Sequence, residues 1–311
     1  MRNVPYLRVV VTTQCPLRCD FCHAEGEPPT STDRATALAT REVVDLVGVA
    51  IASGVRKVKF LGGEPLARRD LPEIIAGIRA LDGDVDLSLI TAGAVDRRRL
   101  DACFAAGLSR ANLSMHGFGL PAFLARTHSS PIAFKLREQL IEALFEYGRF
   151  LKLNYVYTGQ DDEADLAELL TWAASRPVVV GVLDELSSGL GPQGVREALL
   201  RLRGPASSER IEPDPFSLPT HRLHWDDGLE VEVKSSRLGQ LAPWRACGTC
   251  PKRATCAEGI HAVRLSTQGE LRPCLDRPDL GVDLGALLRS AGPSVVRTAW
   301  SHFMETQLAC G

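Results

Sequence analysis

Seven of the nine cysteines in this 311-residue chain fall into two groups whose spacing suits metal or redox chemistry. Cys15, Cys19 and Cys22 follow the pattern C-x3-C-x2-C in the loop predicted after the first strand. The second group consists of Cys247, Cys250, Cys256 and Cys274. Because the cysteine count is odd and no signal peptide is evident, a secreted disulfide framework is disfavoured. We therefore expect a reducing, cytoplasmic setting.

The first group could hold an iron–sulfur cluster. Three thiolates can bind three irons of a 4Fe–4S cluster, which leaves the fourth iron open to a small molecule. Structural zinc sites usually take four ligands with paired C-x2-C steps, and His23, adjacent to Cys22, is poorly placed to share its metal. The remaining alternative is three unrelated loop cysteines. The spacing favours the cluster.

The composition excludes several classes of protein. The formal charge is −2 and 45% of the residues are hydrophobic, which argues against disorder and against nonspecific binding to nucleic acid or membranes. No run of 18 apolar residues occurs, so we expect no transmembrane helix. A chain of this length can bury a large core.

The elements that must position these cysteines alternate between strand and helix. The expected strands cover residues 6–13, 55–61, 85–90, 109–115, 151–157 and 178–184, and the expected helices cover 40–53, 70–81, 96–106, 132–148 and 163–175. Thr40 is the expected N-cap of the first helix and Gly54 its stop. Six strands that alternate with helices predict a partial (βα)6 TIM-like barrel of the α/β class with a parallel sheet.

The alternation stops near residue 190. Residues 204–220 have the composition of a linker, and hairpins are expected at 221–233, around Asp227-Gly228, and at 261–274, around Gln268-Gly269. We therefore predict a barrel over 1–190, a linker and hairpin over 191–240, and a small cluster-binding extension over 241–311.

A glycine-rich segment, FLGGEPL at 60–66, lies about 40 residues after the triad, at the predicted end of the second strand. Together with TTQCPLRCDFCH it resembles the radical S-adenosylmethionine (radical SAM) superfamily. The resemblance implies that SAM binds the open iron and that an external low-potential donor, of flavodoxin or ferredoxin type, supplies an electron. SAM is then cleaved to a 5′-deoxyadenosyl radical that removes a hydrogen atom from a small-molecule substrate. The SAM-binding residues that it implies are Gly62, Gly63, Glu64, Pro65, Ser114 and Asn154.

Further segments, among them KVKFLGGEPLARRDL and VRLSTQGELRPCL, resemble the MoaA-type GTP 3′,8-cyclases over most of the chain. The resemblance implies that cations bind the substrate, at Arg8, Lys57, Lys59, Lys152 and Arg264. Each could instead be a solvated surface charge. That alternative is weaker for Lys57 and Lys59, which share one face of a strand, and for Arg8, which lies inside an apolar strand.

Three departures from the cyclases separate this chain from them. The first arginine of their R-x-R pair is replaced by Ala262, so only Arg264 remains. They use three C-terminal cysteines, whereas this chain has four, and they end in Gly-Gly where this chain ends in Cys310-Gly311. These departures favour a divergent relative, of specialised metabolism, over a GTP cyclase.

The four C-terminal cysteines also resemble the SPASM/twitch extensions of radical SAM enzymes, which carry auxiliary iron–sulfur clusters. Four thiolates would complete an auxiliary 4Fe–4S cluster; alternatively, three bind iron and one stays free, or the site binds zinc. Cys310 is a candidate hydrogen donor for an epimerisation, or simply part of a frayed terminus. Cys103 is expected to be a buried structural thiol.

We therefore predict a radical SAM enzyme that acts on a small polar, anionic or sugar-like substrate. The alternatives are a GTP 3′,8-cyclase of molybdenum-cofactor biosynthesis, an epimerase or dehydrogenase, and a SPASM-type peptide-modifying enzyme. A non-enzymatic alternative is a zinc-stabilised binding scaffold, which would bind neither iron nor SAM.

Overall fold

The computed structural model describes residues 6–27, 37–147, 151–185, 190–213, 219–234, 238, 244–253, 256, 260 and 262–308. The strands in these residues are β1 (Tyr6–Thr12), β2 (Lys57–Gly62), β3 (Asp86–Thr91), β4 (Arg110–Met115), β5 (Leu151–Tyr157), β6 (Val178–Asp184), β7 (Ser208–Glu212), β8 (Thr220–His224), β9 (Glu230–Lys234), β10 (Ala262–Leu265), β11 (Glu270–Arg272) and β12 (Val282–Asp283).

The α-helices are α2 (Thr40–Ala52), α3 (Leu71–Leu81), α4 (Arg98–Ala105), α5 (Leu120–Thr127), α6 (Pro131–Glu146), α7 (Glu163–Ala174), α8 (Gly191–Arg203), α9 (Arg245–Gly248), α10 (Leu284–Ala291) and α11 (Pro293–Gln307). Two short 3-10 helices bear on the site, η1 (Ala24–Gly26) and η2 (Pro65–Ala67).

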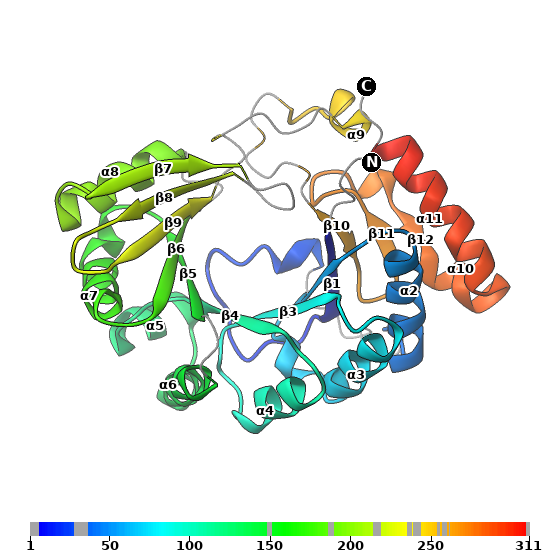
Figure 1. Cartoon of the computed structure of the whole chain (residues 1–311), viewed down its shortest axis with the longest axis horizontal. Helices are drawn as coiled ribbons and strands as arrows, with labels where there is room; N and C mark the ends of the chain where they lie inside the picture. The colour runs from blue at the N-terminus through cyan, green and yellow to red at the C-terminus, as the bar shows by residue number, and fades with distance from the viewer. Residues whose placement is uncertain are drawn as a thin grey trace.

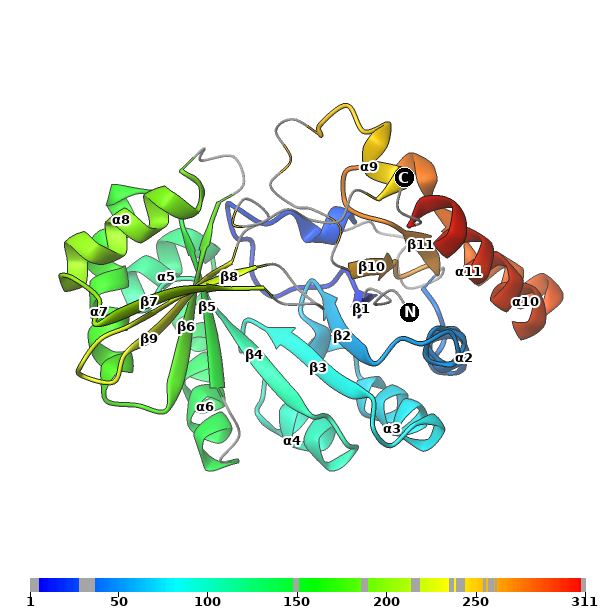
Figure 2. The ribbon, with the colours of Figure 1, turned by 45° about the horizontal axis from the view of Figure 1, so that its top comes forward.

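All of these strands belong to one sheet, in the order β12-β11-β10-β1-β2-β3-β4-β5-β6-β9-β8-β7. The strands β1 to β6 are parallel and follow one another in chain order, while β10 runs parallel to β1 and β9 parallel to β6. Figures 1 and 2 show the sheet as a curved wall with helices on its outer side. The predicted partial (βα)6 barrel is confirmed.

The two faces of the wall differ in chemistry. On β1, Leu7, Val9 and Val11 pack in the apolar core with residues of the outer helices, such as Val43 and Leu46 of α2. Successive strand residues point to opposite faces, so Arg8 points to the inner, concave face. The same alternation runs along β2, β4, β5, β9 and β10, and the inner face therefore carries the polar and charged side chains of these strands.

The hairpins are confirmed, since β8 pairs with β9 and β10 with β11, both antiparallel. The expected linker at 204–220 instead contains β7, which pairs with β8. Residues 191–203 form α8, whose Val195 and Leu199 are buried in the core. Strands from all three predicted segments belong to the same sheet, and the three-domain division stays a prediction.

Two helix details also differ from expectation. The N-cap of α2 is Ala39, while the Thr40 hydroxyl instead donates a hydrogen bond to Asp70. Helix α5, which the sequence reasoning missed, is a short eight-residue helix between β4 and α6. Among the described residues, no helix is long and apolar enough to cross a membrane.

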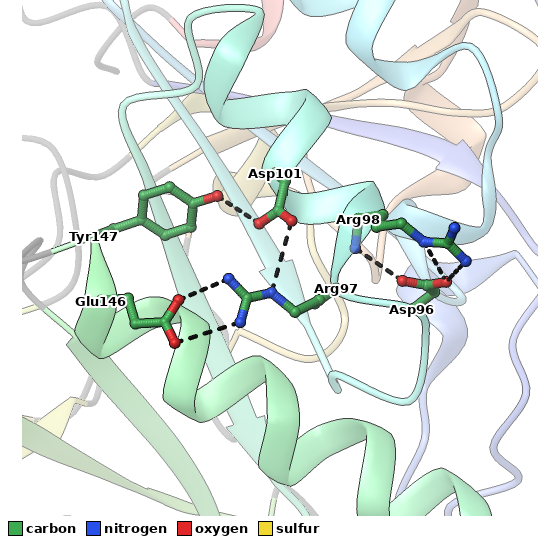
Figure 3. A network of polar contacts seen from close by, with 6 residues as sticks. All are labelled: Asp96, Arg97, Arg98, Asp101, Glu146 and Tyr147. Carbon is green, nitrogen blue, oxygen red and sulfur yellow. Dashed lines mark hydrogen bonds and ion pairs between the residues drawn. The ribbon is translucent and has the colours of Figure 1, made fainter.

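A polar network ties the outer helices together (Figure 3). Arg97, just before α4, contacts Glu146 at the end of α6 at 2.7 Å and Asp101 at 3.6 Å. The Tyr147 hydroxyl donates a hydrogen bond of 2.5 Å to Asp101. Because α4 and α6 lie outside the wall, this network joins neighbouring helices and does not contribute to the inner face.

Candidate active site

The N-terminal cysteines lie in the loop that follows β1, and Figure 1 shows this loop inside the curve of the wall. Cys15 and Cys22 are exposed and Cys19 is partly buried. Burial, together with the neighbouring thiols of Cys15 and Cys22, raises the pKa of Cys19 to about 12. Three thiols that interact in this way suit a shared cluster, whose negative sulfur ligands are stabilised once iron binds.

Backbone contacts fix this loop to α5 and to the end of β2. The Arg18 amide donates to the Thr127 carbonyl at 2.9 Å. The Gly63 amide donates to the Thr12 carbonyl at 2.8 Å, and the Glu64 amide donates to the Gln14 carbonyl at the same distance. The glycine-rich segment therefore holds the residue that immediately precedes Cys15.

The two glycines are required by this contact. A Cβ atom at Gly62 would lie 2.2 Å from the Thr12 carbonyl oxygen, and one at Gly63 would lie 2.5 Å from that of Gln14. The family resemblance implies that these glycines bind SAM. The structure shows an additional reason, the close approach of the two chain segments, which does not depend on SAM.

The Glu64 side chain is fully buried and has a structural role that the sequence did not indicate. Its carboxylate accepts hydrogen bonds from the Thr91 hydroxyl at 2.8 Å and from the Ala92 amide at 2.9 Å, both at the end of β3. It also accepts from the amide of Leu66 in η2, at 3.1 Å. Burial raises the pKa of Glu64 despite these bonds. Glu64 thus joins the ends of β2 and β3 beside the cysteine loop.

Of the remaining predicted SAM residues, Pro65 is buried at the start of η2, and Ser114 and Asn154 lie opposite each other on β4 and β5. Next to them, β6 carries Gly181, where a Cβ atom would lie 2.9 Å from both Asn154 Oδ1 and Lys152 Cε. Gly181 therefore leaves room on the inner face for the Asn154 and Lys152 side chains. Nothing in the sequence distinguished this glycine from others in strands.

The loop after β4 is held by a buried arginine. Arg137 of α6 has no exposed surface, and its guanidinium donates to the carbonyls of Gly117 and Phe118, the second at 2.8 Å. His116, which precedes these residues, has its ring centroid 5.2 Å from that of Phe21 in the cysteine loop. Burial and the nearby arginines lower the pKa of His116 to about 4, so its imidazole is neutral at neutral pH.

Four of the five predicted substrate cations lie together on the inner face of β10, β1 and β2. Register places Arg264 opposite Arg8, and Arg8 opposite Lys59. The ammonium groups of Lys57 and Lys59 both lie over the Tyr6 ring, at 4.8 and 5.7 Å from its centroid. The prediction that the two lysines share a face is confirmed, and tertiary structure adds the two arginines to them.

The fifth cation, Lys152, lies across the wall on β5 and forms a buried ion pair with Glu232 of β9. Glu232 also contacts Arg222 of β8 at 2.8 Å. Burial, with the nearby charge of Lys234, lowers the pKa of Lys152 to about 8. Lys152 is therefore paired with a carboxylate of the protein, and its role in substrate binding stays a prediction.

A buried carboxylate that the sequence reasoning missed lies among the cations. Glu25, in η1, contacts Arg8 at 2.5 Å and Arg264 at 3.5 Å. These two guanidinium groups outweigh the cost of burial and lower the pKa of Glu25 to about 2. Its place three residues after Cys22 was the only available signal.

A hydrogen bond and an ion pair join the segments that carry the C-terminal cysteines. The Arg277 guanidinium donates to the Ala246 carbonyl at 2.7 Å, and so joins the segment after Cys274 to α9. Lys252 contacts Asp276 at 2.5 Å. Burial and the neighbouring thiols raise the pKa of Cys247; the thiols are those of Cys256 and Cys250.

The two cysteine groups approach the cations from opposite ends of the β1–β10 pair. Because β10 is parallel to β1 and starts opposite Tyr6, Cys256 precedes the pair and Cys15 follows it. Because β11 is antiparallel to β10, it ends near the start of β10, and Cys274 follows it there. In the residues described, no three His, Cys, Asp or Glu side chains are already arranged around one metal-ion position. Cys310 lies outside the described residues.

Comparison with known proteins finds a family model that matches more than half of this chain. Residues 9–173 match the family model described as the radical SAM superfamily. The GTP 3′,8-cyclase of Heliobacterium modesticaldum (strain ATCC 51547 / Ice1) is 30% identical over 284 residues, which cover 88% of this chain and 81% of that protein. The probable GTP 3′,8-cyclase of Methanocella arvoryzae (strain DSM 22066 / NBRC 105507 / MRE50) is also 30% identical, over 89% of this chain and 83% of that protein.

Among solved structures, Streptococcus suis SuiB bound to S-adenosylmethionine matches with a TM-score of 0.61 at 14% identity, over 95% of this chain. The match covers 66% of the SuiB chain, so the present chain spans about two thirds of that protein. SuiB bound to the precursor peptide SuiA gives the same TM-score. At this identity, the likeness concerns the fold alone.

Proposed function

The chain belongs to the radical SAM superfamily and is a radical SAM enzyme, and from this premise we propose that it removes a hydrogen atom from a small anionic or sugar-like substrate. The family implies SAM and a 4Fe–4S cluster as cofactors. The observation that carries the substrate class is the group of cations on the inner face of β10, β1 and β2, which we call the cationic wall: Arg264, Arg8, Lys57 and Lys59.

Lys59 gives the clearest reason for an anionic ligand. Burial lowers its pKa well below the usual value, and the nearby cations, Lys57 and Arg8 first among them, lower it further. Within the described part of the chain, no carboxylate is within ion-pair distance of Lys59. A desolvated ammonium among other cations is costly, and an oxyanion bound between them would offset that cost.

Cys15, Cys19 and Cys22 would hold the SAM-binding cluster, because their thiols interact electrostatically with one another and two of them are exposed. With SAM bound, such a cluster would pass on the electron from the external donor that cleaves SAM to the 5′-deoxyadenosyl radical, and this radical would remove the substrate hydrogen. The chain's own contribution is to position the reactants. Gly62 and Gly63 bring the end of β2 to the cysteine loop, and Ser114 and Asn154 present polar groups to SAM from β4 and β5.

An auxiliary 4Fe–4S cluster at Cys247, Cys250, Cys256 and Cys274 is the second part of the proposal. It is supported by the thiols that neighbour Cys247 and by the hydrogen bond from Arg277 to the Ala246 carbonyl of α9. A cytoplasmic location and a flavodoxin- or ferredoxin-type electron donor complete it. Cys310 stays a candidate hydrogen donor on sequence grounds alone.

Binding of inorganic triphosphate tests the cationic wall. In calorimetric titrations of the reconstituted protein, Lys59→Met should weaken triphosphate binding at least tenfold, because it removes the buried cation. Lys135→Met is the matched control, since Lys135 is exposed on α6, and it should leave the affinity unchanged. Equal affinity in Lys59→Met and the wild type would contradict an anionic substrate at this wall.

GTP is the second candidate substrate, and the similarity of this chain to GTP 3′,8-cyclases over most of its length favours it. Ala262 weakens that case: it pairs with Tyr6 on the inner face, fully buried, at the position where the cyclases place an arginine. Incubation of the reconstituted protein with GTP, SAM and dithionite distinguishes GTP from another anionic substrate. Formation of a cyclised purine nucleotide would identify a cyclase, whereas its absence, with triphosphate binding intact, would favour another anionic substrate.

A further inference from the structure

The cationic wall already contains an anion of the protein itself. Glu25 contacts Arg8 at 2.5 Å and Arg264 at 3.5 Å, and its side chain is 7% exposed. The second contact is loose, and Glu25 Oε2 is buried without a hydrogen-bond partner among the described residues. The carboxylate therefore occupies the space between the two guanidinium groups without satisfying its own second oxygen.

The backbone that carries Glu25 is in an unfavourable conformation. Ala24 and Glu25 have φ angles of 49° and 51°, in the left-handed region that residues other than glycine rarely adopt. In this region the Cβ atom lies close to the following carbonyl oxygen, which strains the backbone. The ion pairs of Glu25 help to maintain this turn, so release of the carboxylate would also relieve the strain.

Resting on the proposed anion site, we propose that Glu25 is an internal counterion that competes with the substrate for Arg8 and Arg264. An oxyanion that binds these arginines must displace the Glu25 carboxylate. Glu25 thereby sets the minimum affinity that a ligand must have for Arg8 and Arg264. Multiply charged groups of the phosphate type can bind several cations of the wall at once, and therefore bind tightly enough to displace Glu25. A single carboxylate makes no more contacts with the arginines than Glu25 does, and therefore does not displace it.

The test is a titration of reconstituted, full-length protein with inorganic triphosphate and with inorganic phosphate at constant ionic strength. Glu25→Gln should tighten both about tenfold, because it removes the competitor and leaves the arginines in place. Glu142→Gln is the matched control: it removes an equal charge from an exposed position on α6, outside the curved sheet. It should change affinity less than twofold.

Unchanged or weaker binding in Glu25→Gln would overturn the inference, because Glu25 would then position the arginines for the ligand. An equal gain in both variants would also overturn it, since only net charge would matter. Absence of triphosphate binding in every protein would overturn the proposed anion site itself, a different failure.

A second measurement uses the wild type and does not depend on the stability of a variant. The amides of Gly26 and Glu27 donate to the carbonyls of His23 and Ala24, at 2.9 Å each. Displacement of Glu25 should loosen this turn, so triphosphate should accelerate hydrogen exchange in the peptide 23–27. Slower or unchanged exchange at saturating triphosphate would show that the carboxylate stays in place.

Discussion

Individual residues at this site are constrained by neighbouring backbone as much as by any ligand. Gly63 is the clearest case, because an added Cβ would lie 2.5 Å from the Gln14 carbonyl and 2.6 Å from that of Thr13. Gly63→Ala should therefore lower the free energy of unfolding of the metal-free protein by about 1–3 kcal/mol, measured by urea denaturation. Gly83→Ala is the control, since a Cβ there meets nothing within 4 Å. Equal stabilities of the two variants would refute the steric argument.

At the scale of elements, the turn between β10 and β11 anchors the cysteine loop. The buried Thr267 donates to the Glu27 carboxylate through its hydroxyl at 2.7 Å and through its amide at 3.0 Å. Thr267→Val removes one of two hydrogen bonds to a charged group, which should cost about 1.5–3 kcal/mol in urea denaturation. The peptide 22–27 should also exchange its amide hydrogens faster.

The matched control for this element is Thr171→Val, on the exposed side of α7, where the hydroxyl bonds only to its own helix. It should change stability by less than about 0.5 kcal/mol. If Thr267→Val lowered the stability no more than this and left amide hydrogen exchange in the peptide 22–27 unaltered, the β10–β11 hairpin would not anchor the cysteine loop.

For the whole molecule, one sheet brings together two cysteine groups that are far apart in the chain, with the cationic wall between them. If both groups bind 4Fe–4S clusters, anaerobically reconstituted protein should contain about 8 iron atoms per chain. The Cys15/Cys19/Cys22→Ala triple variant should retain about 4, as determined by metal analysis. About one zinc and almost no iron in that variant would instead show that the C-terminal site is structural.

The fold class, the family and the two cysteine groups could be predicted from the amino-acid sequence alone. Strand–helix alternation is a local pattern, readable from β-rich segments and helical periodicity. Closely spaced motifs such as C-x3-C-x2-C and GGEP depend only on neighbours along the chain. For the same reason, the shared face of Lys57 and Lys59 followed from the two-residue period of a strand.

The contacts between residues far apart in the chain could be seen only in the folded protein. The pairing of Arg8 with Arg264, the Glu25 carboxylate between them and the Lys152–Glu232 ion pair all join segments that sequence spacing does not relate. The role of Gly181 likewise depends on a neighbouring strand. Such contacts depend on strand order and register, which are set by packing of the whole sheet. The sequence could therefore name the cations of the site but not the carboxylates that balance them.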